Sequence, residues 1–138
     1  MRPRPAVPDT NVLVSGLLTP AGDCSAILNL IGDERVEPCF DDRIFREYED
    51  VLARPELGIE PQDAAELLAL LRTNGRLVVA PPLSGPLPDS DDQAMLEVAA
   101  AAGAVLVTGN MRHFPAHLRH GVVVLAPREF LDHLRREG

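Results

Sequence analysis

Short apolar runs alternate along the chain with longer segments in which apolar residues recur every three or four positions. Runs of the first kind are typical of buried strands, and segments of the second kind are typical of amphipathic helices. The strand-like runs are AV before Pro8, VEPCF, RLVVA, AVLVTG and GVVVLA. The helix-like segments are CSAILNLIG, DRIFREYEDVLAR, PQDAAELLALLRTNG, DDQAMLEVAAAAG and PREFLDHLRRE. This alternation predicts an α/β fold in which a central, mainly parallel five-stranded sheet is flanked by helices.

The first strand-like run stops at three polar residues, Asp9, Thr10 and Asn11, before apolar residues resume. Asp and Asn side chains readily bond their own backbone, so a strand end followed by a capped turn explains the pattern. For Asp9 to be a metal ligand, carboxylates from other elements must reach the same point. The two interpretations are compatible.

The segment PDSDDQAMLEV places two acids at the start of a helix. Ser90 and Gln93 have the spacing of a capping box, which predicts Ser90 as the N-cap. The helix dipole favours acids in the first turn, and this is a sufficient reason for Asp91. Asp92 is different, because it lies on the line of the helix that faces the core, with Met95, Leu96 and Ala99.

A carboxylate that points inward needs a positive partner. The chain contains no Lys, and this helix contains no Arg. A bound cation beside Asp92 would meet that need.

The helix-like segment DRIFREYEDVLAR contains a further candidate acid. Glu47 and Glu49 lie on opposite flanks of its apolar side, and the pattern alone does not choose between them. Glu47 is also placed to pair with Arg43, one helical turn earlier.

A polar group follows the fourth strand-like run, where Thr108, Gly109 and Asn110 precede His113. Open α/β sheets build their sites at the carboxyl ends of strands, near the point where strand order reverses, so we expect this group to lie close to Asp9. The oxygen-bearing candidates are then Asp9, Glu47, Asp92 and Asn110. Such hard ligands select Mg²⁺ or Mn²⁺, and a cation would relieve the repulsion among three acids.

The composition of the chain excludes some classes of function. The chain has 138 residues, which suits a single domain over residues 1–138, and its formal charge is -8 with 13 basic residues, all Arg. Such an acidic protein is not a charge-driven nucleic-acid binder, so any nucleic acid must be held by local Arg residues or bound cations. The absence of Lys argues against a phosphorylatable receiver domain, which needs a Lys after a late strand.

The cysteines, the histidines and the hydropathy of the chain argue against a disulfide-rich protein, a zinc protein and a membrane protein. Cys24 and Cys39 are too few for a disulfide framework. His113, His117 and His120 have a spacing that suggests zinc, but Pro115 interrupts the helical face and no further ligand joins them. No apolar run is long enough to span a bilayer, so we expect a cytoplasmic protein.

Four segments together resemble PIN-domain proteins, in particular the small prokaryotic group of toxin components from toxin-antitoxin systems. These segments are PDTNVLVSGLL, REYEDVLARP, DSDDQAMLEVAAAAGAVLVTGNMRHFP and VVVLAPREFL. The resemblance implies a three-layer α/β/α fold and an acidic pocket that binds Mg²⁺ or Mn²⁺. It also implies metal-dependent hydrolysis of RNA phosphodiester bonds, a cognate antitoxin and a possible homodimer.

The resemblance assigns roles to individual residues. It implies Asp9, Glu47 and Asp92 as catalytic metal ligands, and it selects Glu47 over Glu49 because the family's acid precedes an aromatic residue and a VL pair. Asn11, Thr108 and Asn110 fall at positions that support the pocket. Nearness to these motifs suggests Arg43, Arg46 and Arg112 as contacts for RNA phosphates.

One departure from the family pattern concerns a fourth acid soon after the fourth strand. This chain has Asn110 and His113 there. Either Asp89 or Asp91 compensates, or a second metal binds only with the RNA phosphate. The alternative function is a PIN-like module that binds RNA or protein without cutting.

Overall fold

The computed structural model describes residues 2–137, which form six α-helices, three short 3-10 helices and five strands. The strands are β1 (Arg4–Pro8), β2 (Val36–Phe40), β3 (Arg76–Leu77), β4 (Val105–Val107) and β5 (Val124–Leu125). The α-helices are α1 (Thr10–Leu18), α2 (Asp23–Gly32), α3 (Asp42–Leu52), α4 (Pro61–Asn74), α5 (Ser90–Ala102) and α6 (Pro127–Glu137). The 3-10 helices are η1 (Pro55–Leu57), η2 (Met111–His113) and η3 (Ala116–Leu118).

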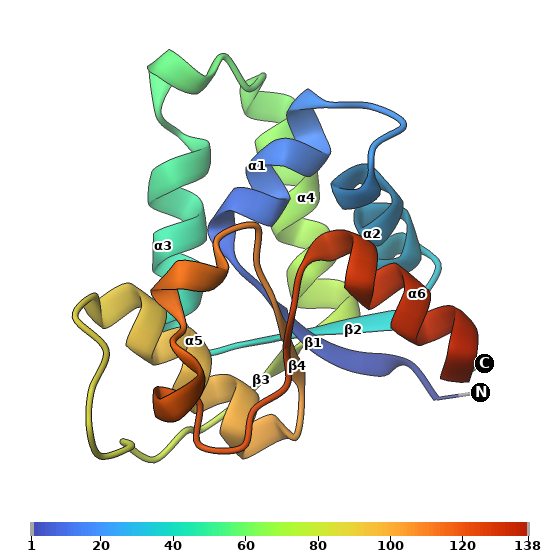
Figure 1. The fold of residues 1–138 in the computed structure, drawn as a ribbon. Coiled ribbons are helices and arrows are strands. Elements are labelled where there is room, and N and C mark those ends of the chain that lie inside the picture. Colours follow the sequence, from blue (N-terminus) through green and yellow to red (C-terminus); the bar gives the residue numbers. More distant parts are fainter. Residues whose placement is uncertain (1, 138) are drawn as a thin grey trace.

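The five strands form one sheet in the order β3-β2-β1-β4-β5, and every pairing is parallel. β1 is central: Ala6 pairs with Pro38 of β2 on one side and with Val105 of β4 on the other. The chain leaves β1 toward β2 and later returns to the opposite side of β1 as β4, so strand order reverses there (Figure 1). The carboxyl ends of β1 and β4 therefore form the place where open α/β sheets hold their ligands.

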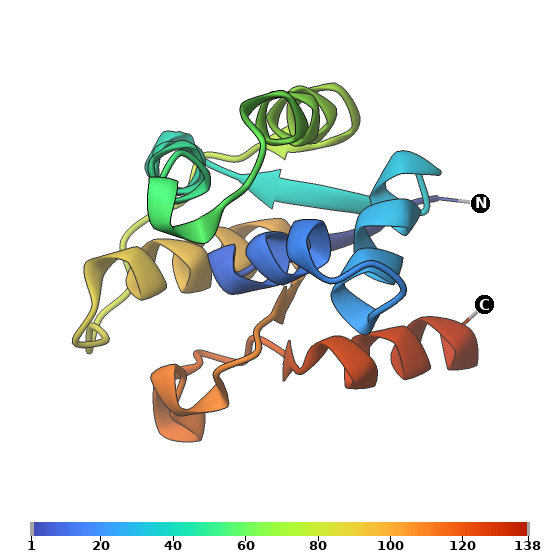
Figure 2. The same cartoon turned by 90° about the horizontal axis from the view of Figure 1, so that it is seen from above.

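Helices cover both faces of this sheet, as right-handed crossovers require. α1 packs on α2, and α2 also contacts α4 and α6, whereas α5 packs against β1, β2 and β4. Figure 1 shows α1 and α3 rising above the strands with α5 running below them, and Figure 2 shows α3 and α4 on the β2 side of β1 with α6 on the opposite side of the sheet. The predicted three-layer α/β/α arrangement is confirmed, and all five strands are parallel.

A buried tyrosine ties α3 to the end of β1. Tyr48 is fully buried, and its hydroxyl donates a hydrogen bond to the carbonyl of Pro8. Because Pro8 immediately precedes Asp9, this contact holds α3 next to the carboxyl end of the central strand. It also brings Glu47, the neighbour of Tyr48, to that end of the sheet.

The sequence pattern missed one helix. The pattern predicts a capped turn after Asp9, but these residues continue into the nine-residue helix α1. Val12, Leu13 and Gly16 are buried there, and Gly16 packs so tightly that an added Cβ would lie 2.5 Å from Leu28 of α2. Valine and glycine have low helix propensity, and packing of α1 on α2 overrides it.

Strand lengths also differ from the prediction. RLVVA contributes only Arg76–Leu77 to the sheet, and GVVVLA contributes only Val124–Leu125, because both lie at sheet edges. Within residues 2–137 no single helix is long and apolar enough to cross a membrane. Only α1 and α2 taken together would suffice by length and composition, and they are bent by 98°.

Candidate metal centre

Asp9 lies directly after β1, where it both caps α1 and faces the switch point of the sheet. Its side chain is buried, and one carboxylate oxygen accepts a hydrogen bond from the backbone N–H of Thr10 at 2.8 Å. The other oxygen accepts one from the hydroxyl of Thr108 at 2.7 Å and one from the amide of Asn11 at 3.3 Å. Burial raises the pKa of Asp9, and the hydrogen bond from Thr108 opposes that rise.

The polar residues that follow β4 support Asp9 from the neighbouring strand. Thr108 is completely buried, and its hydroxyl oxygen also accepts a hydrogen bond from the backbone N–H of Asn110 at 3.0 Å. The side-chain oxygen of Asn11 accepts one from the backbone N–H of Gly109 at 3.3 Å. These contacts join the ends of β1 and β4, as we expected from the sequence.

Asp92 reaches the same point from the first turn of α5. Its side chain lies on the buried line of the helix with Met95, Leu96 and Ala99, as the pattern predicts. Desolvation by burial raises the pKa of Asp92 to about 6, with further contributions from the charges of Asp89 and Asp9. Two carboxylates, from β1 and α5, therefore share this poorly solvated region.

His113 is the side chain that faces Asp92. Its Nδ1 lies 3.4 Å from Oδ2 of Asp92, and its Nε2 lies 3.0 Å from the amide nitrogen of Asn110. The ring of His113 therefore lies between the Asp92 carboxylate and the side chain of Asn110. Asn110, His113 and Asp92 thus form one chain of polar contacts at this end of the sheet.

Glu47 approaches from α3. It is half-buried, whereas Glu49 is exposed, so burial agrees with the choice of Glu47. Desolvation and a hydrogen bond shared with the carboxyl of Asp91 raise the pKa of Glu47 to about 7. The predicted ion pair between Glu47 and Arg43 is absent from the described residues.

Asp89 caps α5, which corrects the prediction for Ser90. The carboxylate of Asp89 accepts hydrogen bonds from the backbone N–H groups of Asp91, at 2.8 Å, and Asp92, at 3.4 Å. Gln93 does not act in a capping box, because its side-chain oxygen accepts a hydrogen bond from the backbone N–H of Leu87. An acid is as good an N-cap as serine, and DSDD offered both at adjacent positions.

Comparison with known families identifies the chain. The model of the PIN domain matches residues 5–112, which is most of the chain and includes every residue described above except His113. The chain belongs to the PIN domain family. No curated protein sequence matches it. PIN domains are in general metal-dependent nucleases that act on RNA, and they often pair with antitoxins.

The acids of this PIN domain form an open group of possible ligands. Within residues 2–137, no three His, Cys, Asp or Glu side chains lie close enough together to hold a metal ion directly. Their chemistry nevertheless fits a hydrated divalent cation: Mg²⁺ prefers oxygen ligands and keeps several of its waters, so its protein ligands can stand apart. The raised pKa values of Asp9, Asp92 and Glu47 indicate carboxylates that lack a sufficient positive partner.

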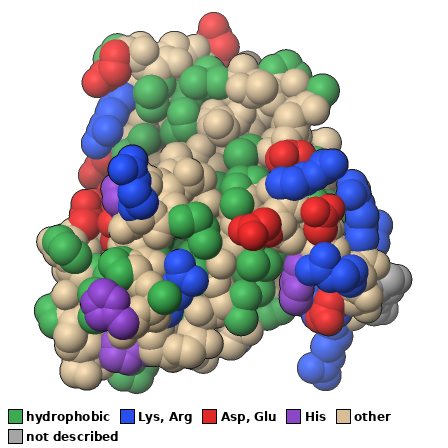
Figure 3. Space-filling view, viewed as in Figure 1, with side chains coloured by type: hydrophobic (Ala, Val, Ile, Leu, Met, Phe, Trp, Pro, Cys, Tyr) green, Lys and Arg blue, Asp and Glu red, His purple; other side chains and the backbone are tan. Residues whose placement is uncertain are grey.

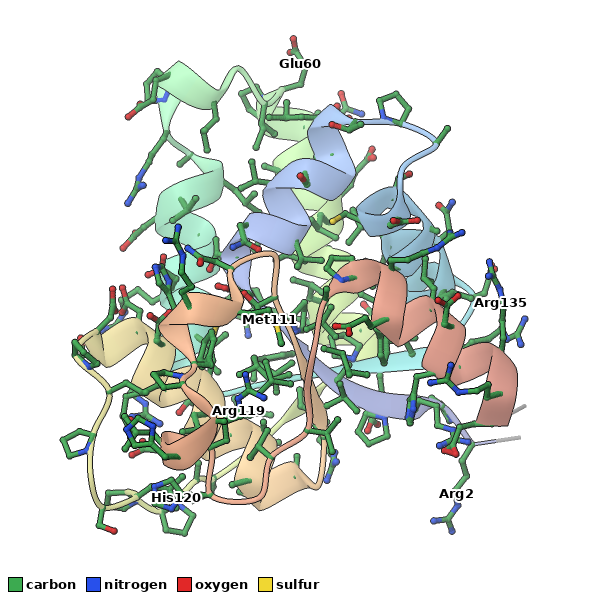
Figure 4. All side chains as sticks on the ribbon, in the orientation of Figure 1. Arg2, Glu60, Met111, Arg119, His120 and Arg135 are labelled. Carbon is green, nitrogen blue, oxygen red and sulfur yellow. The ribbon has the colours of Figure 1, made fainter. Side chains whose placement is uncertain are left out.

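The histidine spacing does not produce a zinc site in the described part of this PIN domain. His113 faces Asp92, whereas His120 contacts the carbonyl of Ser84 at 2.8 Å. Figure 4 shows His120 at the far lower end of the molecule, well away from Met111 of η2.

The three arginines suggested as RNA contacts have different surroundings. Arg43 is bound within the protein, with its guanidinium 2.7 Å from Asp41 and 2.8 Å from Glu97. Arg46 and Arg112 are exposed, and neither forms an ion pair with any residue in the range 2–137. Only these two are free to contact a phosphate without breaking an existing pair.

Glu97 is a buried acid that the sequence pattern did not single out. It is 5% exposed, and it accepts hydrogen bonds from Arg43, from the backbone N–H of Leu83 at 2.9 Å and from Gln93 at 3.0 Å. Gln93 lies one helical turn before Glu97, and this spacing was the feature of the sequence that could have suggested their hydrogen bond. These contacts lower the pKa of Glu97 despite its burial, which marks it as a structural anion.

Proposed function

We propose that this PIN domain is an endoribonuclease that hydrolyses RNA phosphodiester bonds with Mg²⁺ or Mn²⁺. The observation that supports the proposal is that Asp9 and Asp92 lie near each other at the carboxyl ends of β1 and β4, with Glu47 on α3, the helix that Tyr48 ties to the end of β1. These carboxylates come from three separate elements, and their pKa values are raised. A purely structural cluster would normally be neutralised by arginine, as Glu97 is.

Asp9 and Asp92 would hold the cation, and Glu47 would complete its surroundings or orient the attacking water. When bound, the cation supplies charge neutralisation at the phosphate oxygens and lowers the pKa of water. Thr108 and Asn11 hold the Asp9 carboxylate in one orientation through their hydrogen bonds. Asn110 and His113 would position a ligand beside Asp92, and Asp89 and Asp91 add negative charge at the rim.

The biological role that we propose is that of a toxin in a toxin-antitoxin pair in the cytoplasm. An acidic pocket is naturally blocked by a basic side chain, so a cognate antitoxin would insert an arginine among these acids. A homodimer is part of the same proposal. Co-purification of a small basic protein, lost when the acids are neutralised, would support the antitoxin.

The test of the nuclease is cleavage of a labelled structured RNA in Mg²⁺, Mn²⁺ or EDTA. We expect cleavage by the wild type only with a divalent cation, and none by Asp92→Asn. Asp132→Asn is the matched control, because Asp132 is a partly exposed acid on α6 that forms an ion pair with Arg135. Equal cutting by the wild type and Asp92→Asn would assign the activity to a contaminant.

One observation favours a second candidate function. The open arrangement of acids, with Asn110 at the position of the fourth acid, suits a PIN domain that binds RNA or protein without cutting. RNA binding that survives Asp92→Asn, with no cleavage under any metal, would support this alternative.

A further inference from the structure

A polar cavity opens beside the candidate metal centre. It has a volume of about 490 Å³ and is lined by Asn11, Ser15, Cys24, Gly109, Asn110 and Arg112. Asn11 and Asn110 belong to the hydrogen-bonded group around Asp9, so the cavity begins where that group ends. Its lining contains no acid.

A second cavity continues from the first. It has a volume of about 330 Å³, shares Ser15 and Cys24 with the first, and extends to Asp23 and to the turn between β5 and α6 at Pro127 and Arg128. The two cavities are neighbours whose linings together extend from Arg112 to Arg128, and we call this stretch of surface the α1–α2 groove. Each part is in the size range of pockets for small molecules, which suits single nucleotides and is too small for a duplex.

Charge distinguishes this groove from the other side of the centre. Glu47, Asp89 and Asp91 lie on the α3–α5 side, where a polyanion would be repelled. Figure 3 shows acidic side chains at the edge of the molecule near the start of α5, whereas the surface between that edge and α6 is mostly uncharged. In a protein of net charge -8, the lining of the groove contains Arg112 and Arg128 against the single acid Asp23, so it repels a polyanion less than the α3–α5 side does.

We infer that the α1–α2 groove holds the single-stranded RNA segment that flanks the scissile phosphate. This inference rests on the proposed function for the position of that phosphate. Arg112, which has no ion-pair partner in residues 2–137, contacts the first flanking phosphate. Arg128, whose exposed contact with Asp23 is 3.4 Å long, exchanges that partner for a phosphate farther along the strand.

Ser15 and the remaining hydrogen-bonding capacity of Asn11 and Asn110, beyond their contacts with Asp9, Gly109 and His113, would be available to bases between these two arginines. Amide and hydroxyl groups bond base edges without adding charge. The groove therefore both carries the strand and provides polar groups for base preference.

Cys24 provides a direct probe of occupancy. It is partly exposed in the groove, whereas Cys39, the second cysteine of the chain, is completely buried. A short single-stranded RNA should slow the reaction of Cys24 with Ellman's reagent several-fold, measured in EDTA with the wild type and in Mn²⁺ with Asp92→Asn. A duplex RNA of the same sequence should not.

Arginine variants give a second measurement. Removal of one phosphate contact should lower the salt slope of single-strand binding by about 0.7. We expect this change for Arg128→Ala but not for Arg136→Ala, which removes the same charge from the exposed far end of α6. Both variants keep the candidate metal centre intact.

The outcomes separate this inference from the proposed nuclease. Cleavage of RNA without protection of Cys24, and with equal salt slopes for the two variants, overturns the groove and leaves the nuclease standing. Protection of Cys24 with the expected slopes but without cleavage supports the groove and overturns the nuclease. Equal protection by duplex RNA, or no protection and no cleavage, overturns the groove in either case.

Discussion

At the scale of single residues, the buried carboxylate of Asp9 depends on a few neutral donors. Its three hydrogen-bond donors are the Thr10 backbone, the Thr108 hydroxyl and the Asn11 amide, and none carries a charge. Such donors stabilise the anion enough to keep it in place without neutralising it. This environment leaves the Asp9 carboxylate available to a cation, whereas Glu97 is already satisfied by Arg43.

Among these donors, the loss of the Thr108 hydroxyl should lower the free energy of unfolding most. Thr108→Val keeps the shape of the side chain but removes the hydroxyl that donates to Asp9 and accepts from Asn110. We expect the free energy of unfolding to fall by about 1.5–3 kcal/mol, the usual range for a hydrogen bond to a charged group. Urea denaturation measures this change.

Thr108→Ser is the control for this prediction, because it keeps the hydroxyl and loses only a methyl group. It should also retain more of the cleavage activity than Thr108→Val. If the two variants have the same free energy of unfolding, the Thr108 hydroxyl does not support Asp9.

At the scale of elements, α5 is fixed by polar contacts at both of its ends. Asp89 caps its first turn, and Gly103 ends it in the left-handed conformation with φ of 63°. Between these ends, Glu97 connects α5 to Arg43 of α3 and to the backbone of Leu83 in the preceding loop. The position of Asp92 therefore depends on contacts that α5 makes with its neighbours.

We expect Arg43 to stabilise the fold through its ion pair with Glu97, whereas an arginine that only contacts RNA would not affect stability. Arg43→Ala leaves the buried Glu97 without its cation, so we expect the free energy of unfolding to fall by about 1–2 kcal/mol, less than for a fully buried pair because Arg43 is half exposed. Arg46→Ala, an exposed change on the same helix, should leave stability unchanged. Thermal unfolding with parallel RNA-binding measurements checks both.

A loss of RNA affinity in Arg43→Ala with an unchanged unfolding midpoint would contradict this assignment. Arg43 would then be an RNA contact, as its nearness to Glu47 in the sequence first suggested.

The elements also show what the sequence could and could not predict. The periodicity of DRIFREYEDVLAR predicted α3 because one face of that helix is buried. The apolar run VEPCF predicted β2 because most of that strand is buried. α1 was missed because its residues are poor helix formers and its helix depends on packing against Leu28, which is distant in the sequence. The positions of Asp9 and Asp92 could be predicted, because Asp9 follows a strand and Asp92 lies on the core-facing line of a helix. The Glu97–Arg43 pair could not be predicted, because it joins positions 54 residues apart in the sequence.

At the scale of the whole molecule, acids outnumber bases, 21 to 13, and the arginines are distributed unevenly among them. Arginine ion pairs within residues 2–137 reach six acids, which are Asp23, Glu37, Asp41, Glu97, Asp132 and Glu137. Asp92 and Glu47 are left without an arginine partner among residues 2–137. Asp92 and Glu47 therefore carry negative charge that no arginine pair balances, and we expect this to affect stability measurably.

Without a cation, the protein should become less stable as pH rises. The pKa values of Asp92 and Glu47 are raised in the folded state to about 6 and about 7, from ordinary values of 3.8 and 4.5. Between about pH 4 and pH 7 the folded state therefore binds more protons than the unfolded state, so the free energy of unfolding falls as pH rises through this window. Thermal unfolding in EDTA at pH 5 and pH 8 measures the effect.

Mn²⁺ should reverse this loss, and more strongly at pH 8 than at pH 5, because a cation binds the deprotonated carboxylates. At a free concentration of one hundred times Kd, a cation bound only to the folded state adds about 2.7 kcal/mol. The double variant Asp92→Asn with Glu47→Gln separates these two acids from the general repulsion of an acidic protein, since it keeps the remaining acids and should lose both the pH effect and the response to Mn²⁺. A wild-type protein that gains stability in EDTA from pH 5 to pH 8, or that responds to Mn²⁺ no more than the double variant does, would show that these carboxylates do not form a metal centre.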